Sequence, residues 1–202
     1  ATGTVVEDDA GQNTVGGQLA ATDVDAGDTQ TWSLIGGGNT TTGSYGALTL
    51  NAATGEWEYT LDDALANGLK AGETRTETFT ALVTDSKGAT AEQQIAVTVT
   101  GSNDAPVNTA PATATAQEDT PLAISGVSVA DVDGNTLTTT ITVTNGTASV
   151  TAGTGAGIGN NGTATITMSG TAAQINAALA GLTFTSTPDY HGPASVQIST
   201  TD

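Results

Sequence analysis

The sequence contains no cysteine, and only 3% of its 202 residues are aromatic. Without cysteine, no disulfide can staple the fold. With a hydrophobic content of 37%, any core must be thin and built mainly from Val, Ile, Leu and Ala. Small domains with such cores often need an additional stabiliser. A bound metal ion is the remaining candidate for that stabiliser.

Basic residues are even scarcer than aromatic ones. Only Lys70, Arg75 and Lys87 oppose 21 acidic residues, which leaves a formal net charge of −18. This balance excludes nucleic-acid binding, since phosphate contacts need a basic surface, and it disfavours an electrostatic grip on anionic lipid. Uncompensated acid destabilises a compact state through self-repulsion, which divalent cations would relieve. The alternative interpretation is that the acidity only keeps a secreted protein soluble.

Three further features are missing from the sequence. No apolar run is long enough to span a bilayer, and no signal peptide is recognisable at Ala1. Because the pattern opens and closes part-way through a repeat, we interpret the chain as a fragment of something longer. His191 is the only histidine and there is no cysteine, so we expect neither a zinc site nor a Ser-His-Asp triad. We therefore do not expect an enzyme.

Short stretches of alternating apolar and polar residues dominate both halves, often with threonine on the polar face. Alternation of this kind predicts strands, and several short strands at regular spacing predict an all-β sandwich. The predicted strands are residues 30–34, 47–50, 56–61 and 95–99 in the first half, and residues 123–129, 138–143, 147–150, 163–168, 182–185 and 195–199 in the second.

One stretch breaks the strand pattern. Thr171 and Gln174 have the spacing of a capping box, and Ile175 and Leu179 follow at helical intervals. This predicts one short helix in the second half, between two strands. A weaker helical turn is expected over residues 62–69.

An acidic pattern occurs twice and divides the chain. Each copy has an acidic pair, an Asp-x-Asp motif and a closing Thr-Asp, which indicates two homologous domains at residues 1–104 and 105–202. Pro106 lies at the joint and ends the first domain's ladder. The final strand of the first domain, over residues 94–100, has no counterpart after Asp202. We therefore expect the second domain to lack its final strand, with either an exposed sheet edge there or a closing strand supplied by the natural continuation of the chain.

Two family resemblances follow from these residues. Residues 7–9, 19–28, 45–50, 57–61, 78–85 and 97–104 resemble the VCBS repeat, over nearly all of the first domain. Residues 118–122, 131–135 and 184–194 resemble a cadherin-like domain of large bacterial adhesins of the RTX type.

The resemblance implies two tandem Ig-like or cadherin-like β-sandwich domains with a short helix in the second. It also implies a segment of a secreted protein of the bacterial cell surface, often exported by type I secretion. Such proteins use arrays of Ca²⁺-stiffened repeats to hold a binding tip away from the cell, so the expected partners include neighbouring repeats of the same chain.

The strand order of a sandwich sorts the acidic residues into three poles, each a candidate for Ca²⁺, which takes six to eight oxygen ligands. The inter-domain site is predicted to contain Glu7, Asp8, Asp62, Asp63, Asn103, Asp104, Asp131, Asp133 and Asp202. The upper pole of the first domain contains Asp23, Asp25 and Asp85, and the lower pole of the second contains Glu118 and Asp119. For each pair the alternative is a solvated turn, because Asp favours turns and caps.

Two functions remain open at this point. The first is a structural extender that binds Ca²⁺ and has no ligand specificity of its own. The second is an adhesive module of the same surface protein that binds host or surface carbohydrate, a protein or a partner cell. Trp32 and Trp57 could stack on sugars, but both lie in alternating strands, where core packing is the better interpretation. The scarcity of aromatic residues favours the extender.

Overall fold

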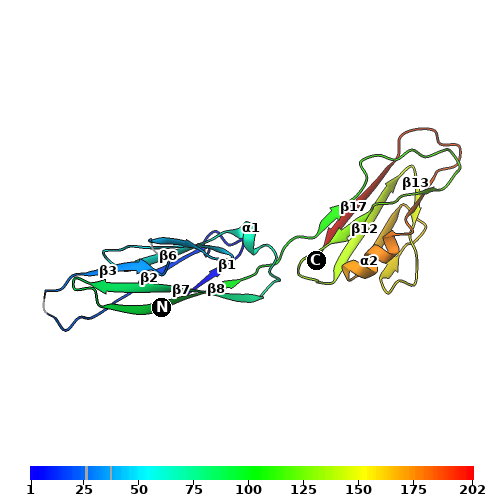
Figure 1. Ribbon diagram of the computed structural model, residues 1–202. Coiled ribbons are helices and arrows are strands. Elements are labelled where there is room, and N and C mark those ends of the chain that lie inside the picture. Colours follow the sequence, from blue (N-terminus) through cyan, green and yellow to red (C-terminus); the bar gives the residue numbers. More distant parts are fainter. Residues whose placement is uncertain (26, 37) are drawn as a thin grey trace. The chain divides into compact units, whose positions relative to one another are not determined.

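A computed structural model of the chain describes residues 1–25, 27–36 and 38–202. The chain divides into two compact units, Ala1–Asn103 and Asp104–Asp202. Strands dominate each unit (Figure 1), and each unit encloses its own hydrophobic cluster. The predicted class, tandem all-β sandwiches of the Ig-like or cadherin-like kind with a short helix in the second, is therefore confirmed.

The first unit is a sandwich of two four-stranded sheets. One sheet has the order β1-β8-β7-β3, in which β1 runs parallel to β8 and the other pairs are antiparallel. The other has the order β2-β6-β5-β4 and is antiparallel throughout. The strands are β1 (Thr2–Val6), β2 (Thr14–Gln18), β3 (Gln30–Leu34), β4 (Thr40–Thr42), β5 (Gly46–Leu50), β6 (Glu56–Leu61), β7 (Thr74–Asp85) and β8 (Thr90–Thr100).

Alternation along these strands builds the core of the first unit. From Ile95 to Val99 in β8 every second side chain is fully buried, namely Ile95, Val97 and Val99, because the pleat sends successive side chains to opposite faces. Trp32 and Trp57 are each only 4% exposed, so they pack in the core as predicted and offer no surface for stacking on sugars. The predicted helical turn is present as the single turn α1 (Asp63–Ala66).

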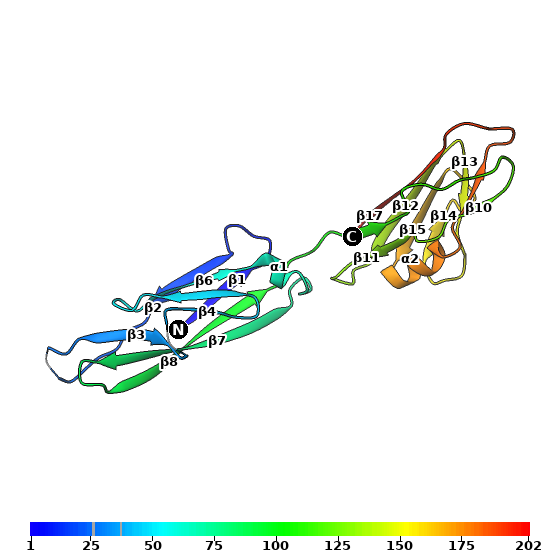
Figure 2. The same cartoon turned by 45° about the horizontal axis from the view of Figure 1, so that its top comes forward.

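The second unit has shorter strands and three sheets (Figure 2). Its largest sheet has the order β14-β15-β12-β17, a second has the order β10-β16-β13, and β11 pairs with β9. The strands are β9 (Val107–Thr109), β10 (Leu122–Ala123), β11 (Ser128–Ala130), β12 (Leu137–Thr144), β13 (Gly146–Ser149), β14 (Gly157–Gly159), β15 (Thr165–Gly170), β16 (Thr183–Ser186) and β17 (Ser195–Thr201).

The predicted helix is α2 (Ala172–Leu179), and its capping box is complete. The Gln174 N–H donates to Thr171 Oγ1 at 3.3 Å, and the Thr171 N–H donates back to Gln174 Oε1 at 2.9 Å. Ile175, Ala178 and Leu179 face the core. The Asn176 side chain donates to and accepts from the backbone of Val129, at 2.8 Å in both cases, and so fixes β11 against the helix.

The predicted continuous strand over residues 123–129 is wrong. The segment forms β10 and β11, which belong to different sheets and are separated by residues 124–127. Gly126 lies in this gap with a φ of +77°, a left-handed conformation that glycine adopts without steric cost. The chain turns there instead of continuing the ladder, and the alternating pattern gave no sign of the turn.

Candidate metal centre

Three carboxylates of the second unit converge at one end of its largest sheet. Asp131 and Asp133 lie in the loop between β11 and β12, and Asp202 directly follows β17. The antiparallel register pairs Thr138 with Thr201, which places the start of β12 beside the end of β17. One carboxylate oxygen from each of the three aspartates lies within 4.8 Å of the others. The register explains why residues about seventy positions apart meet.

The backbone holds this loop in place. The Asp104 N–H donates to Asp133 Oδ2 at 2.8 Å, and the Gly134 N–H donates to Asp131 Oδ1 at 2.8 Å. The second carboxylate oxygen of Asp131 is buried and accepts no hydrogen bond from the described residues. A buried oxygen without a donor is costly, and it is the kind of ligand that a hard cation takes.

The charge balance around this group favours a cation. Residues 104–202 contain no lysine or arginine, so the unit itself offers no strongly basic side chain to the aspartates. Two like charges 4.8 Å apart repel by roughly 0.9 kcal/mol even in bulk water, and more where water is partly excluded. Asp131 and Asp133 are both half-buried. The arrangement can therefore hold a divalent cation through carboxylate oxygens.

At its end next to Asn103, the first unit contains a second acidic group. Glu7 is fully buried, and its Oε2 accepts a hydrogen bond of 3.2 Å from the Ser102 N–H. The Asp8 N–H donates to Asp63 Oδ1 at 3.2 Å, which links the loop after β1 to the start of α1. Glu7, Asp8 and Asp63 therefore lie at the end of the unit that leads to Asn103.

Asp62 has a different role from its neighbours. It is the N-cap residue of α1, and its Oδ1 accepts a hydrogen bond of 3.1 Å from the Ala64 N–H. Asp favours this position because its carboxylate satisfies a helical N–H that has no partner within the helix. The cap accounts for one of the oxygens that the sequence assigned to a metal.

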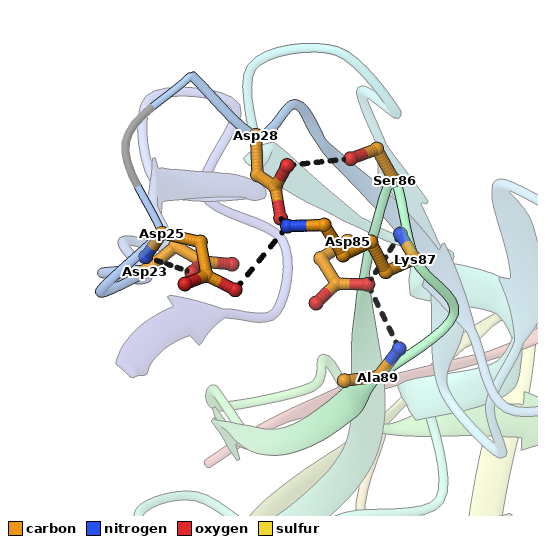
Figure 3. Close-up of polar contacts among 7 residues, drawn as sticks. All are labelled: Asp23, Asp25, Asp28, Asp85, Ser86, Lys87 and Ala89. Carbon is orange, nitrogen blue, oxygen red and sulfur yellow. Dashed lines mark hydrogen bonds and ion pairs between the residues drawn. The ribbon is translucent and has the colours of Figure 1, made fainter.

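A third acidic group lies at the opposite end of the first unit, and its carboxylates pair with a lysine side chain (Figure 3). Asp23, Asp25 and Asp28 meet within 4.8 Å, and Lys87 Nζ lies 3.0 Å from Asp28 Oδ2 and 3.3 Å from Asp25 Oδ2. The Ser86 hydroxyl also donates to Asp28 Oδ1 at 2.9 Å. The hydrogen bonds to Asp28 and Asp25 raise the pKa of Lys87, so this group is partly neutralised by the protein itself.

Asp85, which the sequence placed in this upper group, mainly orders the turn between β7 and β8. Its Oδ1 accepts hydrogen bonds of 2.8 Å from the N–H groups of Lys87 and Ala89 (Figure 3). The Ala89 N–H contributes most to lowering the pKa of Asp85. Asp28 and Lys87 were not among the predicted residues, because their meeting depends on how two loops fold together.

The last acidic group lies in loops of the second unit. Glu118 and Asp119, which the sequence assigned to a lower pole, meet Asp189 within 4.8 Å. The Asp189 N–H donates to Asp119 Oδ1 at 3.2 Å, and all three side chains are exposed. Asp189 was missing from the predicted set. The pairing of Leu122 with Phe184 brings the two loops together, and the sequence does not reveal this register.

Comparison with known proteins identifies a family for the first half. Residues 1–101 match the family model described as "Bacterial cadherin-like domain", which is the half that resembled a VCBS repeat in sequence. No curated protein matches the chain. In the described residues, no helix has the length and apolar character needed to cross a membrane.

Solved structures of cadherin domains are similar to the chain at low identity. Protocadherin Gamma B7 extracellular cadherin domains 1–4 align at 16% identity and a TM-score of 0.46, over 98% of this chain and 46% of that one. Human CDH23 EC21–23 aligns at 14% identity and a TM-score of 0.36, over 98% of this chain and 59% of that one. The chain thus spans less than two thirds of either structure.

Proposed function

Because the chain belongs to the family of bacterial cadherin-like domains, we propose that it is a calcium-binding structural segment of an extracellular adhesin. The family is of the adhesion type and typically not enzymatic. The finer assignments, namely a VCBS repeat, an RTX-type adhesin of the bacterial surface and type I secretion, rest on the sequence resemblance. They form part of this proposal.

A single observation carries the calcium assignment. Asp131, Asp133 and Asp202 converge within 4.8 Å in a unit whose sequence contains neither lysine nor arginine. Carboxylates are the ligands that Ca²⁺ prefers, and its affinity rises with the number of charged ligands. Calcium would relieve the repulsion among the three aspartates and would use the buried Asp131 oxygen.

The predicted sharing of this ion with the first unit remains a hypothesis. On that hypothesis Glu7, Asp8, Asp63 and Asn103 add oxygen ligands to those of the second unit. It is supported within the first unit by the Ser102 N–H bond to Glu7, which places the buried carboxylate one residue from Asn103. Calcium shared in this way would stiffen the joint, as an extender requires.

The adhesive alternative has weaker support. Both tryptophans are buried in the first unit's core. Nothing in the described residues gathers exposed aromatic side chains into a platform for sugar. The extender therefore remains the proposed function.

Thermal unfolding with and without Ca²⁺ tests this proposal. At a Ca²⁺ concentration of 100 times the Kd, a single site that binds only the folded state adds about 2.7 kcal/mol to stability. We expect EDTA to lower the Tm of the wild-type chain, and to leave the Tm of an Asp131→Asn, Asp133→Asn variant unchanged. A wild-type Tm that is equal in Ca²⁺ and in EDTA would contradict the proposal.

A further inference from the structure

Three asparagines of the chain begin an Asn-x-Thr triplet whose middle residue is not proline. They are Asn39, Asn145 and Asn161. This triplet is the acceptor sequence for N-linked glycosylation, in which a sugar is attached to the side-chain nitrogen of the asparagine. All three asparagines are exposed, so exposure does not distinguish them. The hydrogen bonds that each amide makes do distinguish them.

The amide nitrogen of Asn145 is fully used within the second unit. It donates to the Tyr190 hydroxyl and to the Pro193 carbonyl, at 2.9 Å in both cases. A side-chain amide nitrogen has only two hydrogens to donate, and glycosylation replaces one of them. A glycan at Asn145 would therefore break one of the two bonds that join the end of β12 to the loop before β17.

The amide of Asn161 is paired with the backbone of Val150. Its Nδ2 donates to the Val150 carbonyl at 3.0 Å, and its Oδ1 accepts from the Val150 N–H at 2.9 Å. The N–H in such a two-bond pair lies on the same side of the amide C–N bond as Oδ1. In a planar trans amide, that position belongs to the carbon substituent of the nitrogen. A sugar at Asn161 would therefore occupy the place of Val150.

Asn39 differs from both, because its side chain makes no hydrogen bond with the residues that the structure describes. Its position is nevertheless well defined. The Leu50 N–H donates to the Asn39 carbonyl at 2.8 Å, which extends the ladder between β4 and β5 by one residue. Thr41 lies two positions further along, so its side chain is on the same side of the extended chain as that of Asn39. The amide nitrogen and the threonine of this triplet are thus both on an ordered strand.

The surface beside Asn39 suits a sugar. Asn39 borders an open hollow of about 950 Å³, whose lining includes Asn51, Glu56 and Glu58. Carboxylate oxygens accept hydrogen bonds from hydroxyl groups, and an amide nitrogen donates to them. The first sugars of a glycan at Asn39 would therefore lie against polar side chains.

The strand that follows Asn39 also gains from a cover. Among the described residues, β4 pairs only with β5 and forms the edge of its sheet. Its sequence, Thr40–Thr42, contains neither a charge nor a proline. Sheet edges without such protection tend to pair with another chain. A bulky, solubilising glycan one residue before β4 would cover this edge.

We propose that Asn39 is an N-glycan acceptor site of the folded chain and that Asn145 and Asn161 are not. Nδ2 of Asn39 forms a bond to the anomeric carbon of a sugar that is activated by a nucleotide or lipid diphosphate. The bond from that carbon to the diphosphate oxygen breaks, and the diphosphate leaves with the electron pair. Nδ2 gives one proton to a base of the transferase and keeps the other. Thr41 supplies the hydroxyl that the acceptor sequence requires.

Transfer of a single hexose to the folded 202-residue chain tests this assignment. The probe is a soluble N-glycosyltransferase with a nucleotide-activated hexose, chosen because it modifies synthetic peptides of all three triplets. The folded chain should gain one hexose, at Asn39, as located by mass spectrometry of its peptides. Transfer to Asn145 and Asn161 should be slower by about tenfold or more, since their amides must first open locally. After denaturation all three should react. Absence of transfer to Asn39 in the folded chain, or equal transfer to all three asparagines, would overturn the proposal.

A matched pair of variants tests whether Asn39 reacts as part of its triplet. Thr41→Ser keeps the hydroxyl and should retain transfer to Asn39. Thr41→Val has nearly the same shape without the hydroxyl and should abolish transfer. Asn39→Gln should also leave the folded chain unmodified. Transfer to Thr41→Val at the wild-type rate would contradict the assignment, as would a folded Asn39→Gln chain that still gains a hexose.

Discussion

The backbone N–H of Asp104 donates a hydrogen bond of 2.8 Å to Oδ2 of Asp133. This bond connects the first residue of the second unit to its Asp-x-Asp loop. Together with the Gly134 N–H bond to Asp131, it fixes the directions of two carboxylates before any cation arrives. A site ordered in this way loses little conformational entropy when an ion binds.

Asp133→Asn removes the negative charge of this residue but keeps an oxygen that can accept its hydrogen bond. The amide oxygen can still accept from Asp104, so the fold should persist, but one negative ligand is lost. We expect the affinity for Ca²⁺ to fall about tenfold or more, because affinity in such sites depends on the count of charged ligands. Glu92→Gln is the control, since it removes one exposed charge from β8. Equal affinities for both variants, measured by calorimetry, would exclude Asp133 as a ligand.

A second prediction concerns Lys87 and cation binding by the acidic group of Asp23, Asp25 and Asp28 in the first unit. Its ammonium group lies between Asp25 and Asp28, in the position that an added cation would neutralise. Lys87→Gln should therefore raise the Ca²⁺ affinity of this group. Lys70→Gln, which removes the same charge elsewhere in the unit, should not. A Ca²⁺ titration followed by NMR shifts of Asp23 and Asp25 would distinguish the two. Identical titrations would show that Lys87 does not compete with a cation.

The turn after β7 predicts how stability depends on pH. The hydrogen bonds that Asp85 accepts lower its pKa below the ordinary value of 3.8. Because the pKa of Asp85 is lower in the folded state than in the unfolded state, its carboxylate stabilises the folded state at pH values above the unfolded-state pKa. This stabilisation is lost as the pH falls through the folded-state pKa. In Ca²⁺-free buffer, Asp85→Asn should therefore reduce the acid-induced loss of stability below about pH 4. Denaturant unfolding of both proteins across this range measures the effect. Parallel curves would mean that Asp85 contributes nothing.

The ion pairs of Lys87 predict a loss of stability at alkaline pH. Its pKa is raised above 10.5 by Asp28 and Asp25. Its contribution is therefore complete below pH 10.5 and is lost as the pH rises through the folded value. Lys87→Gln should reduce the loss of stability in this alkaline range, by the same measurement.

The hydrogen bond between Tyr59 and Glu77 in the core of the first unit predicts a loss of stability when it is removed. The Tyr59 hydroxyl donates to Glu77, which also accepts from the N–H groups of Ser44 and Tyr45. Burial raises the pKa of Tyr59. Tyr59→Phe removes one donor from a buried carboxylate, which should cost about 1–3 kcal/mol of unfolding free energy. Tyr45→Phe, at the edge of the same core, should cost less. Equal losses would show that the Glu77 contact is not the source.

The strands and the main helix were predictable because their signals are local. Alternation gave β3 and β6 with their exact bounds, and the capping box at Thr171 located α2. The break at Gly126 was missed because glycine also occurs within strands. Its left-handed conformation is visible only in the folded chain.

The candidate site was predictable only in part. Repetition singled out Asp131 and Asp133, and strand order placed Asp202 near them. Asp28 and Asp189 escaped because loop–loop contacts decide their neighbours. Asp62 shows the opposite error, because it was assigned to the metal site but is the N-cap of α1. The sequence alone does not distinguish a capping aspartate from a metal ligand.

The most direct test of the central claim is a calorimetric titration of the EDTA-treated chain with Ca²⁺. The account predicts saturable binding that the Asp131→Asn, Asp133→Asn variant loses and the Glu92→Gln control keeps. Absence of binding by the wild-type chain, or equal binding by the variant that lacks both aspartates, would contradict it.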